Sequence, residues 1–307
     1  QYDQFDFSGE RYIITGKDIA TAVHNDGPGE FFFNAANILL YNGFPLSSYS
    51  PYQNGNITNE DPFVTLAITD IYSAIFGVCQ EALKHAWAHK WRGNRKLRPE
   101  AMAGLIHRAE TTSTNLYNLS SLLFNDLAGF NVLAWTRNRN EQQAFIPNNP
   151  LPINEAQTYL LGLVYPEGSP AHPSYPAGHA TIAGACSTII KAFINDQALI
   201  KDYIAPVKPN PADPIQLISL TDMEGADALT VGSELDKLAS NIALARDFAG
   251  VHYRSDGDKG ILLGEKIALN YLRDHARIYT EQGFNGFELT KRNGQRVRIT
   301  DEQIINI

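Results

Sequence analysis

The stretch "PAHPSYPAGHATIAGAC", residues 170–186, places three prolines, two histidines and a glycine at the entry to an apolar helical pattern. Proline fixes its own backbone angle, so this entry is stiff. A helix that begins at Gly178-His179 directs unpaired backbone N–H groups, and the positive end of its dipole, at whatever lies in front of it. The stretch therefore predicts an anion site at the first turn of this helix.

Helical periodicity dominates the rest of the chain, because apolar residues recur at spacings of three and four. The expected helices cover residues 31–43, 60–90, 100–135 (as one or two helices), 154–168, 179–195, 233–248 and 258–279. Acidic residues and Pro62 at the start of 60–90 are typical of a helix beginning there. Residues 287–300 alternate around Asn293-Gly294 and predict a β-hairpin with a two-residue turn. We expect one mainly α-helical domain over residues 1–307, with a small C-terminal hairpin.

The composition is that of an ordinary globular protein: 307 residues, 44% hydrophobic, 19% charged, net charge −8. The acidic balance argues against nucleic acid or a membrane surface as the main partner. No apolar run approaches the roughly 20 residues that span a bilayer. Cys79 and Cys186 are too few for a disulfide framework or a zinc site. The start "QYDQFDFSGE" has neither Met nor a signal-peptide core, which indicates a processed chain or part of a longer one.

A basic run lies at residues 89–99, "HKWRGNRKLRP", with five positive charges in nine residues. Taken alone, it would be interpreted as a solvated basic loop. However, Gly93-Asn94 interrupts a long apolar helix, so Lys90 can point inward from its last turn. Arg98, followed by Pro99, can point inward from the entry of the next helix.

A third segment, "ALARDFAGVHYRSD" at residues 243–256, carries Arg246 and His252. Six residues correspond to about 600° around an α-helix, which would leave the two side chains on different sides. Gly250 permits a break after which both can converge on one point. Asp256, four residues past His252, could hold an imidazole or a guanidinium in place. Ordinary surface charges at a helix end are the alternative.

Together the three segments offer three cations, a helix N-terminus and two histidines. This set suits a tetrahedral oxyanion that carries two or three negative charges. One histidine could then bond the central atom while the other handles protons. No serine lies in a strand-turn-helix elbow, and the P-loop and dinucleotide glycine patterns are absent.

The combined pattern is Lys90…Arg98-Pro99, then Pro176-Ala177-Gly178-His179, then Arg246…Gly250…His252…Asp256. It resembles the three-part signature of vanadium-dependent haloperoxidases, which type 2 phosphatidic acid phosphatases and bacterial acid phosphatases share. The contexts "HPSYPAGHAT" and "GVHYRSD" are most similar to the algal and cyanobacterial bromoperoxidase branch. The resemblance covers nearly the whole chain and corresponds to the C-terminal, catalytic half of the longer red-algal enzymes. It implies a helical bundle of the haloperoxidase and acid phosphatase type.

The resemblance also implies a role for each site residue. His252 would be the axial ligand of vanadium, while Lys90, Arg98, Arg246 and the Gly178 N–H would hold oxygens of the vanadate cofactor. His179 would act as acid and base, and His172 would lie near the peroxide and the halide. Trp87, one turn before Lys90, is similar to a residue that lines the halide pocket; a plain core aromatic is the alternative.

The implied reaction is the oxidation of bromide or iodide by hydrogen peroxide to hypohalous acid, which halogenates small organic substrates. Family resemblance also suggests a homo-oligomer. The alternative enzyme is an acid phosphatase of the same superfamily, with His252 as nucleophile and His179 as the leaving-group acid. A third possibility is an inactive anion-binding module, which Ala177 would mark.

Two features depart from the pattern or extend it. The family motif usually reads Pro-Ser-Gly-His, whereas this chain has Ala177 in place of the serine that would hydrogen-bond a vanadate oxygen. A bond of that kind contributes roughly 1.5–3 kcal/mol, so its loss should weaken cofactor binding and leave cofactor identity unchanged. Residues 52–63, "YQNGNITNEDPF", offer oxygens between Asn54 and Asp61 that could hold a structural Ca²⁺; a plain turn with a helix cap is the alternative.

Overall fold

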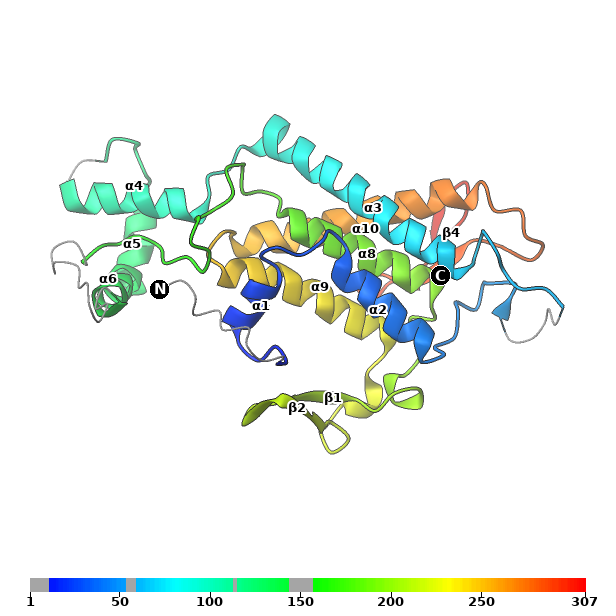
Figure 1. Ribbon diagram of the computed structural model, residues 1–307. Helices are drawn as coiled ribbons and strands as arrows, with labels where there is room; N and C mark the ends of the chain where they lie inside the picture. The colour runs from blue at the N-terminus through cyan, green and yellow to red at the C-terminus, as the bar shows by residue number, and fades with distance from the viewer. Residues whose placement is uncertain (1–10, 54–58, 113–114, 144–156) are drawn as a thin grey trace.

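The computed structural model describes residues 11–53, 59–112, 115–143 and 157–307 and is mainly helical (Figure 1). Its α-helices are α1 (Gly16–Ala22), α2 (Glu30–Tyr41), α3 (Ile68–Ala88), α4 (Pro99–Thr112), α5 (Ser121–Gly129), α6 (Val132–Gln143), α8 (Gly178–Phe193), α9 (Val231–Phe248) and α10 (Arg254–Ala276). The predicted fold class, a helical bundle with a small C-terminal β-structure, is confirmed. Within the described ranges, no helix combines the length and the apolar character needed to cross a membrane.

Helix α8 lies at the centre of the bundle. Its residues from Ala180 to Phe193 are all buried, so other elements enclose it on every side. Helices α3, α9 and α10 pack along it (Figure 1). The backbones of α8 and α10 nearly touch, because a Cβ on Gly184 would lie 2.1 Å from the Ile261 carbonyl oxygen. A Cβ on Gly264 would lie 2.0 Å from the Thr181 carbonyl oxygen. This close approach fixes the N-terminus of α8 against the first turns of α10.

Helix α3 differs from the sequence prediction at its start and agrees with it at its end. The predicted start near Pro62 is wrong, since the helix begins at Ile68, where the Asp70 carboxylate accepts a hydrogen bond from the Leu66 N–H at 2.9 Å. At the other end the chain continues into a π-helical turn, η2 (His89–Asn94), and stops at Arg95 with a left-handed φ of 42°. The expected break at Gly93-Asn94 therefore occurs there.

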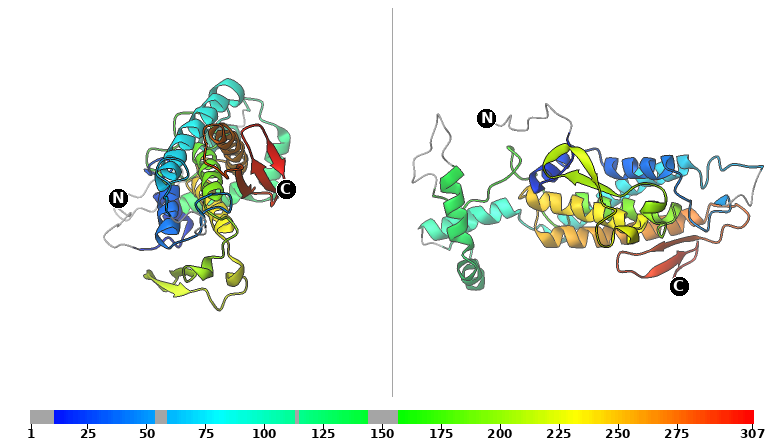
Figure 2. Two further views of the ribbon diagram at one scale, coloured as in Figure 1. Left: turned by 90° about the vertical axis from the view of Figure 1, so that its right-hand side faces the viewer. Right: turned by 90° about the horizontal axis from the view of Figure 1, so that it is seen from below.

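Residues 99–168 differ most from the helices expected. The span 100–135 contributes to three helices, α4, α5 and α6, which project from one end of the bundle (Figures 1 and 2). The helix expected at 154–168 is wrong for its described part, 157–168, which is irregular. The Asn140 amide donates to the carbonyl oxygens of Thr158 and Leu160, at 3.0 and 2.9 Å. The Val164 N–H donates to Ala249 O at 3.2 Å. These tertiary partners replace helical hydrogen bonds.

The β-structure includes the predicted hairpin and a second one that was not predicted. Strands β3 (Phe287–Thr290), β4 (Arg296–Ile299) and β5 (Ile304–Asn306) form an antiparallel sheet. Lys291 N–H donates to Gln295 O at 2.9 Å, so the turn contains residues 292–294 and not two residues, with Gly294 at φ 83°. The proline-rich segment 205–214 contains β1 (Val207–Asn210), which pairs with β2 (Asp213–Ser219) away from the bundle (Figure 1).

Candidate active site

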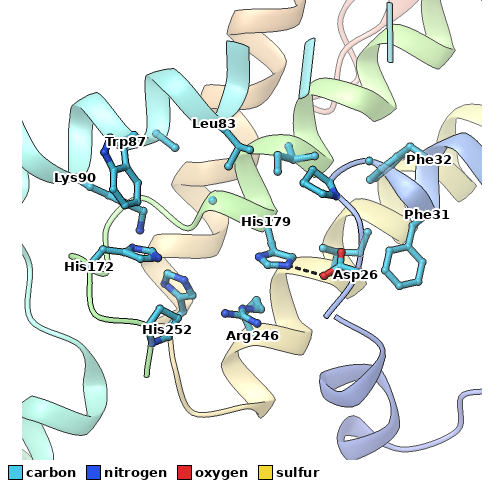
Figure 3. A pocket seen from close by; sticks show the side chains of 17 residues that line it. Asp26, Phe31, Phe32, Leu83, Trp87, Lys90, His172, His179, Arg246 and His252 are labelled. Carbon is cyan, nitrogen blue, oxygen red and sulfur yellow. Dashed lines mark hydrogen bonds and ion pairs between the residues drawn. The ribbon is translucent and has the colours of Figure 1, made fainter. Parts of the chain in front are cut away.

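The three predicted segments meet at a cavity of about 270 Å³ beside the N-terminus of α8 (Figure 3). Of the candidate residues, the cavity is lined by Trp87, Lys90, His172, Gly178, His179, Arg246 and His252. Arg98 and Asp256 lie behind this lining and bind His252 from two sides. Helix α9 ends at Phe248 and Gly250 takes a φ of 81°, which allows Arg246 and His252 to face the same cavity.

The imidazole of His252 is buried and held in one tautomer. Its Nδ1 lies 3.1 Å from Asp256 Oδ2 and its Nε2 lies 3.0 Å from Arg98 Nη1. A guanidinium only donates, so Nε2 has to accept and Nδ1 carries the proton. Burial, opposed by the Asp256 bond and reinforced by Arg98, lowers the pKa of His252 to about 3. The side chain is therefore a neutral imidazole whose Nε2 lone pair accepts a hydrogen bond from Arg98 in this structure. The same lone pair is the one that a neutral imidazole offers to a metal, and Arg98 would have to release it for a metal to bind there.

Asp256 fixes this arrangement from the first turn of α10. Besides His252, its carboxylate accepts from Lys96 Nζ at 2.8 Å, from the Ser174 hydroxyl, and from the Tyr253 N–H at 3.1 Å. Burial raises the pKa of Asp256, but the bonds from His252, Lys96 and Ser174 outweigh it and hold that pKa well below its usual range. Of the two partners expected for Asp256, an imidazole or a guanidinium, the structure has the imidazole.

The cations Lys90, Arg98 and Arg246 are buried, and none forms an ion pair with a carboxylate in the described parts of the chain. Lys90 Nζ donates to the carbonyl oxygens of Pro173 and Ser174, at 2.6 and 3.0 Å. Arg98 donates to the carbonyl oxygens of His172 and Val251, both at 2.8 Å. Carbonyl dipoles orient these side chains without neutralising them, so the positive charge remains available to a ligand.

The pKa values of Lys90 and Arg98 are lowered by burial and then by this excess of positive charge. Burial first, and then the charges of Arg98 and Arg246 against the opposing pull of Asp256, lowers the pKa of Lys90 to about 7. Burial and Arg246 lower the pKa of Arg98 to about 10. Groups that repel one another in this way are stabilised together by a bound anion.

Arg246 has a buried nitrogen without a hydrogen-bond partner among the described residues. Its Nη1 donates to Val23 O at 3.1 Å and to the Tyr165 hydroxyl at 3.0 Å, while the buried Nε has no hydrogen-bond partner among the described residues. Tyr165 is itself fixed, because its hydroxyl donates to Ala20 O at 2.8 Å. An unpaired buried donor is unfavourable, and a ligand in the cavity would supply the missing acceptor.

His172 and Trp87 form one wall of the cavity (Figure 3). Their ring centroids are 5.1 Å apart, and Arg98 Nη2 lies 3.0 Å from His172 Nδ1. Burial, followed by the charges of Lys90 and Arg98, lowers the pKa of His172 to about 4. Trp87 is 51% exposed, so the alternative that it is a plain core aromatic is wrong.

His179 lies in the first turn of α8 and has a carboxylate partner that the sequence did not reveal. Its Nε2 is 2.9 Å from Oδ1 of Asp26, which reaches the cavity from the loop between α1 and α2 (Figure 3). The carboxylate accepts a hydrogen bond from Nε2–H, so the Nδ1 atom keeps its lone pair. In this tautomer the imidazole can take up a second proton at Nδ1.

The N-terminus of α8 faces the cavity at Gly178, and the residue before it is Ala177. Ala177 is fully buried and packs with Ala180, Ala243 and Ile261. Its own N–H donates a hydrogen bond to Asp256 O at 3.0 Å. The first N–H groups of α8 have no intrahelical acceptor, whereas Ala177 has no side-chain donor to add to them.

Sequence reasoning missed Asp26, Lys96, Ser174 and Tyr165, which hold the predicted residues in place. Lys96 and Ser174 lie inside quoted motifs, but nothing in those motifs separates a partner of Asp256 from a surface residue. The calcium site expected between Asn54 and Asp61 includes residues 54–58, which lie outside the described residues.

Residues 77–281 match the family described as the VCPO second helical-bundle domain. The chain is 37% identical over 295 residues to a vanadium-dependent bromoperoxidase from Corallina pilulifera, covering 95% of this chain and 47% of the relative. It is 34% identical over 281 residues to one from Ascophyllum nodosum, covering 91% and 47%. A solved homohexameric vanadate-dependent bromoperoxidase (AnII) from Ascophyllum nodosum superposes with a TM-score of 0.80 at 26% identity, covering 96% and 50%. The chain thus spans about half the length of these relatives.

Proposed function

The chain belongs to the family of vanadium-dependent haloperoxidases, and from this premise we propose that it carries the catalytic centre of a bromoperoxidase-type enzyme. In this proposal it oxidises bromide or iodide with hydrogen peroxide to hypohalous acid, which halogenates small organic molecules. The observation that carries the proposal is His252, a buried neutral imidazole whose Nε2 lone pair faces cations that lack a carboxylate partner.

Vanadate is the cofactor that fits these residues. His252 would bind vanadium through Nε2, and Lys90, Arg98, Arg246 and the Gly178 N–H would hold its oxygens. The unpaired Nε of Arg246 and the lowered pKa values of Lys90 and Arg98 support an anion with several acceptor atoms. Asp256 supports the first contact, because its bond to Nδ1 orients the ring and increases the basicity of Nε2.

Bound vanadate would supply an electron-poor centre that activates hydrogen peroxide for two-electron oxidation of a halide. The residues around it would then manage protons and charge. His179 would take the peroxide proton at Nδ1, and Asp26 would stabilise the resulting imidazolium through Nε2. His172 and Trp87, which form one wall of the cavity, would border the halide. Because the pKa of His172 is lowered to about 4, this side chain would be neutral and would border the halide without adding a positive charge.

Because Ala177 stands in place of a serine, the group of residues that would hold vanadate lacks one hydroxyl donor and keeps its other donors. The helix N-terminus, the three cations and His252 do not depend on it. We therefore propose that Ala177 weakens vanadate binding and leaves the reaction class unchanged.

We also propose that the protein assembles into homo-oligomers. The solved AnII relative is a homohexamer. In this chain the projecting α4–α6 region exposes large apolar side chains, among them Leu122, Phe130 and Trp135, which are 71%, 79% and 62% exposed. Light scattering coupled to size exclusion should give a mass above one chain, and a monomer at all concentrations would contradict this.

The test of function is bromination of a 1,3-diketone by metal-stripped protein, with bromide and hydrogen peroxide, across an orthovanadate titration. We expect bromination that saturates with vanadate. A parallel reaction offers p-nitrophenyl phosphate without vanadate. Cleavage of the ester in the absence of bromination would assign the phosphatase reaction instead, and binding of vanadate with neither activity would indicate an anion-binding module.

A further inference from the structure

The two cysteines of the chain face each other inside the helical bundle. Cys79 lies on α3 and Cys186 on α8, and both are buried free thiols. Their sulfur atoms are 3.2 Å apart, although the residues are 107 positions apart in the sequence. A disulfide has a sulfur–sulfur distance of about 2.05 Å, so an approach of roughly 1.2 Å would bring the two atoms to bonding distance.

The thiol pair lies directly behind the wall of the anion-site cavity. Leu83 and Ile182 line that cavity, and each is four residues away from a cysteine on its own helix. Residues four apart share a helix face, so the faces of α3 and α8 that border the cavity also carry the thiols. Gly29 lines the cavity too, and a Cβ on it would lie 2.5 Å from Cys79 Sγ. The sulfur of Cys79 therefore lies against a residue of the cavity wall.

We propose that Cys79 and Cys186 are a modification site, at which hydrogen peroxide converts the two thiols into a disulfide that joins α3 to α8 and stabilises the bundle. In the proposed function, peroxide enters this cavity as a substrate, so the oxidant arrives next to Cys79. Burial, and then the neighbouring Cys79, raises the pKa of the Cys186 thiol. Peroxide reacts with the thiolate form, so Cys186 is a poor first target and the first attack falls on Cys79.

The reaction balances with peroxide as its only oxidant. The Cys79 sulfur attacks one oxygen of peroxide, so that an S–O bond forms as the O–O bond breaks, and the thiol proton leaves with the other oxygen as water. The Cys186 sulfur then attacks the Cys79 sulfur. The S–S bond forms as the S–O bond breaks, and the hydroxyl leaves with the Cys186 proton as a second water. Two thiols lose two electrons, and one peroxide is reduced to two waters.

The test is a count of thiols in the full chain, which is first reduced and then exposed to hydrogen peroxide. Vanadate and bromide are left out, so the result does not depend on the proposed function. Samples are denatured in N-ethylmaleimide, which labels free thiols, and are analysed by mass spectrometry. We expect two labels before peroxide and none after it, with a linked peptide that contains Cys79 and Cys186. Two labels after peroxide, or sulfinic acids without a linked peptide, would overturn the proposal.

Two variants test the order of attack. In Cys186→Ala the sulfenic acid formed at Cys79 has no thiol partner, and dimedone, which reacts with sulfenic acids, should label it. In Cys79→Ala the remaining thiol lies deeper, and its labelling should be about tenfold slower or more. Equal rates in the two variants would contradict the cavity as the route of the oxidant.

Thermal unfolding measures what the disulfide does to the fold. A cross-link between residues so distant in sequence constrains the unfolded chain strongly. Peroxide should therefore raise the Tm of the wild type by about 5 °C or more. Cys79→Ala under the same treatment is the control for oxidation at other side chains, and its Tm should not rise. A linked peptide without a higher Tm in the wild type would overturn the stabilising role.

Discussion

Raising the pH above 7 should weaken the binding of an oxyanion, and Lys90 should be the cause. Burial and the neighbouring Arg98 lower the pKa of Lys90 to about 7 in the free protein. Below that pH the amine is already charged, and above it the amine is neutral. An anion beside Nζ favours the charged form, so binding above pH 7 has to take up a proton.

The size of the effect follows from the uptake of one proton. Well above pH 7 the affinity should fall about tenfold per pH unit, or about 1.4 kcal/mol. Because half of the amine is already neutral at pH 7, the fall between pH 7 and 9 should be about 50-fold. The fall ends where Lys90 in the complex also loses its proton. Two histidines of the cavity do not contribute, because the pKa values of His172 and His252 lie at about 4 and 3. Arg98, with a pKa of about 10, stays charged.

The assay is isothermal titration calorimetry with sulfate, a tetrahedral anion that keeps one protonation state over this range. Two buffers that differ in ionisation enthalpy report the protons taken up. Lys90→Met should bind weakly at pH 7 and lack the Lys90-dependent slope. Lys84→Met is the control, because Lys84 lies on α3, the helix that continues into the η2 turn of Lys90, and is exposed and paired with Glu81. A wild-type affinity that is flat from pH 7 to 9, with no proton uptake, would refute the reasoning.

Three further predictions concern the cavity and the helices that support it. Ala177→Ser should tighten vanadate binding about tenfold, since a hydrogen bond to a charged group contributes roughly 1.5–3 kcal/mol; a vanadate titration with unchanged affinity would mean that the hydroxyl does not reach the anion. Tyr165→Phe removes the hydroxyl that accepts a hydrogen bond from Arg246, so sulfate binding measured by calorimetry should weaken about tenfold. An unchanged affinity would show that Val23 O alone orients the guanidinium. Gly184→Ala should destabilise the fold by about 1–3 kcal/mol or more in chemical denaturation, because its Cβ would meet Ile261 O; Gly104→Ala, with open space around it, should cause no loss.

The segments of the site could be predicted because each carries a local signal that is independent of the rest of the fold. Gly93-Asn94 and Gly250 are residues at which a helix breaks, and the structure has a left-handed turn directly after the first and at the second. A break in a helix redirects the side chains on either side of it. Lys90 and Arg246 could therefore be placed facing inward without knowledge of what they face.

The partners of those residues depend on contacts between distant segments. Asp26 and His179 are 153 positions apart, and Ser174 and Asp256 are 82 apart. No periodicity or motif connects residues at such separations, and only the packing of α8 against its neighbours brings them together. The same cause explains the error at 157–168, where backbone groups of Thr158 and Val164 bond to Asn140 and Ala249 instead of to a helical neighbour.

The way in which the cations are held decides what the site can bind. Carboxylate partners would have stabilised Lys90, Arg98 and Arg246 and cancelled their charge, whereas the carbonyls of Pro173, Val251 and Val23 orient them and leave the charge in place. Burying unpaired charges costs several kcal/mol for each ion, so a bound oxyanion should stabilise the folded chain as well as the site. Asp26 at the cavity and Asp256 behind its lining bind histidines instead. The cations alone would hold any tetrahedral anion, but the Nε2 lone pair of His252 favours an anion whose central atom accepts a nitrogen ligand. The vanadium of vanadate accepts such a ligand and the sulfur of sulfate does not. The same cavity should therefore bind vanadate more tightly than sulfate.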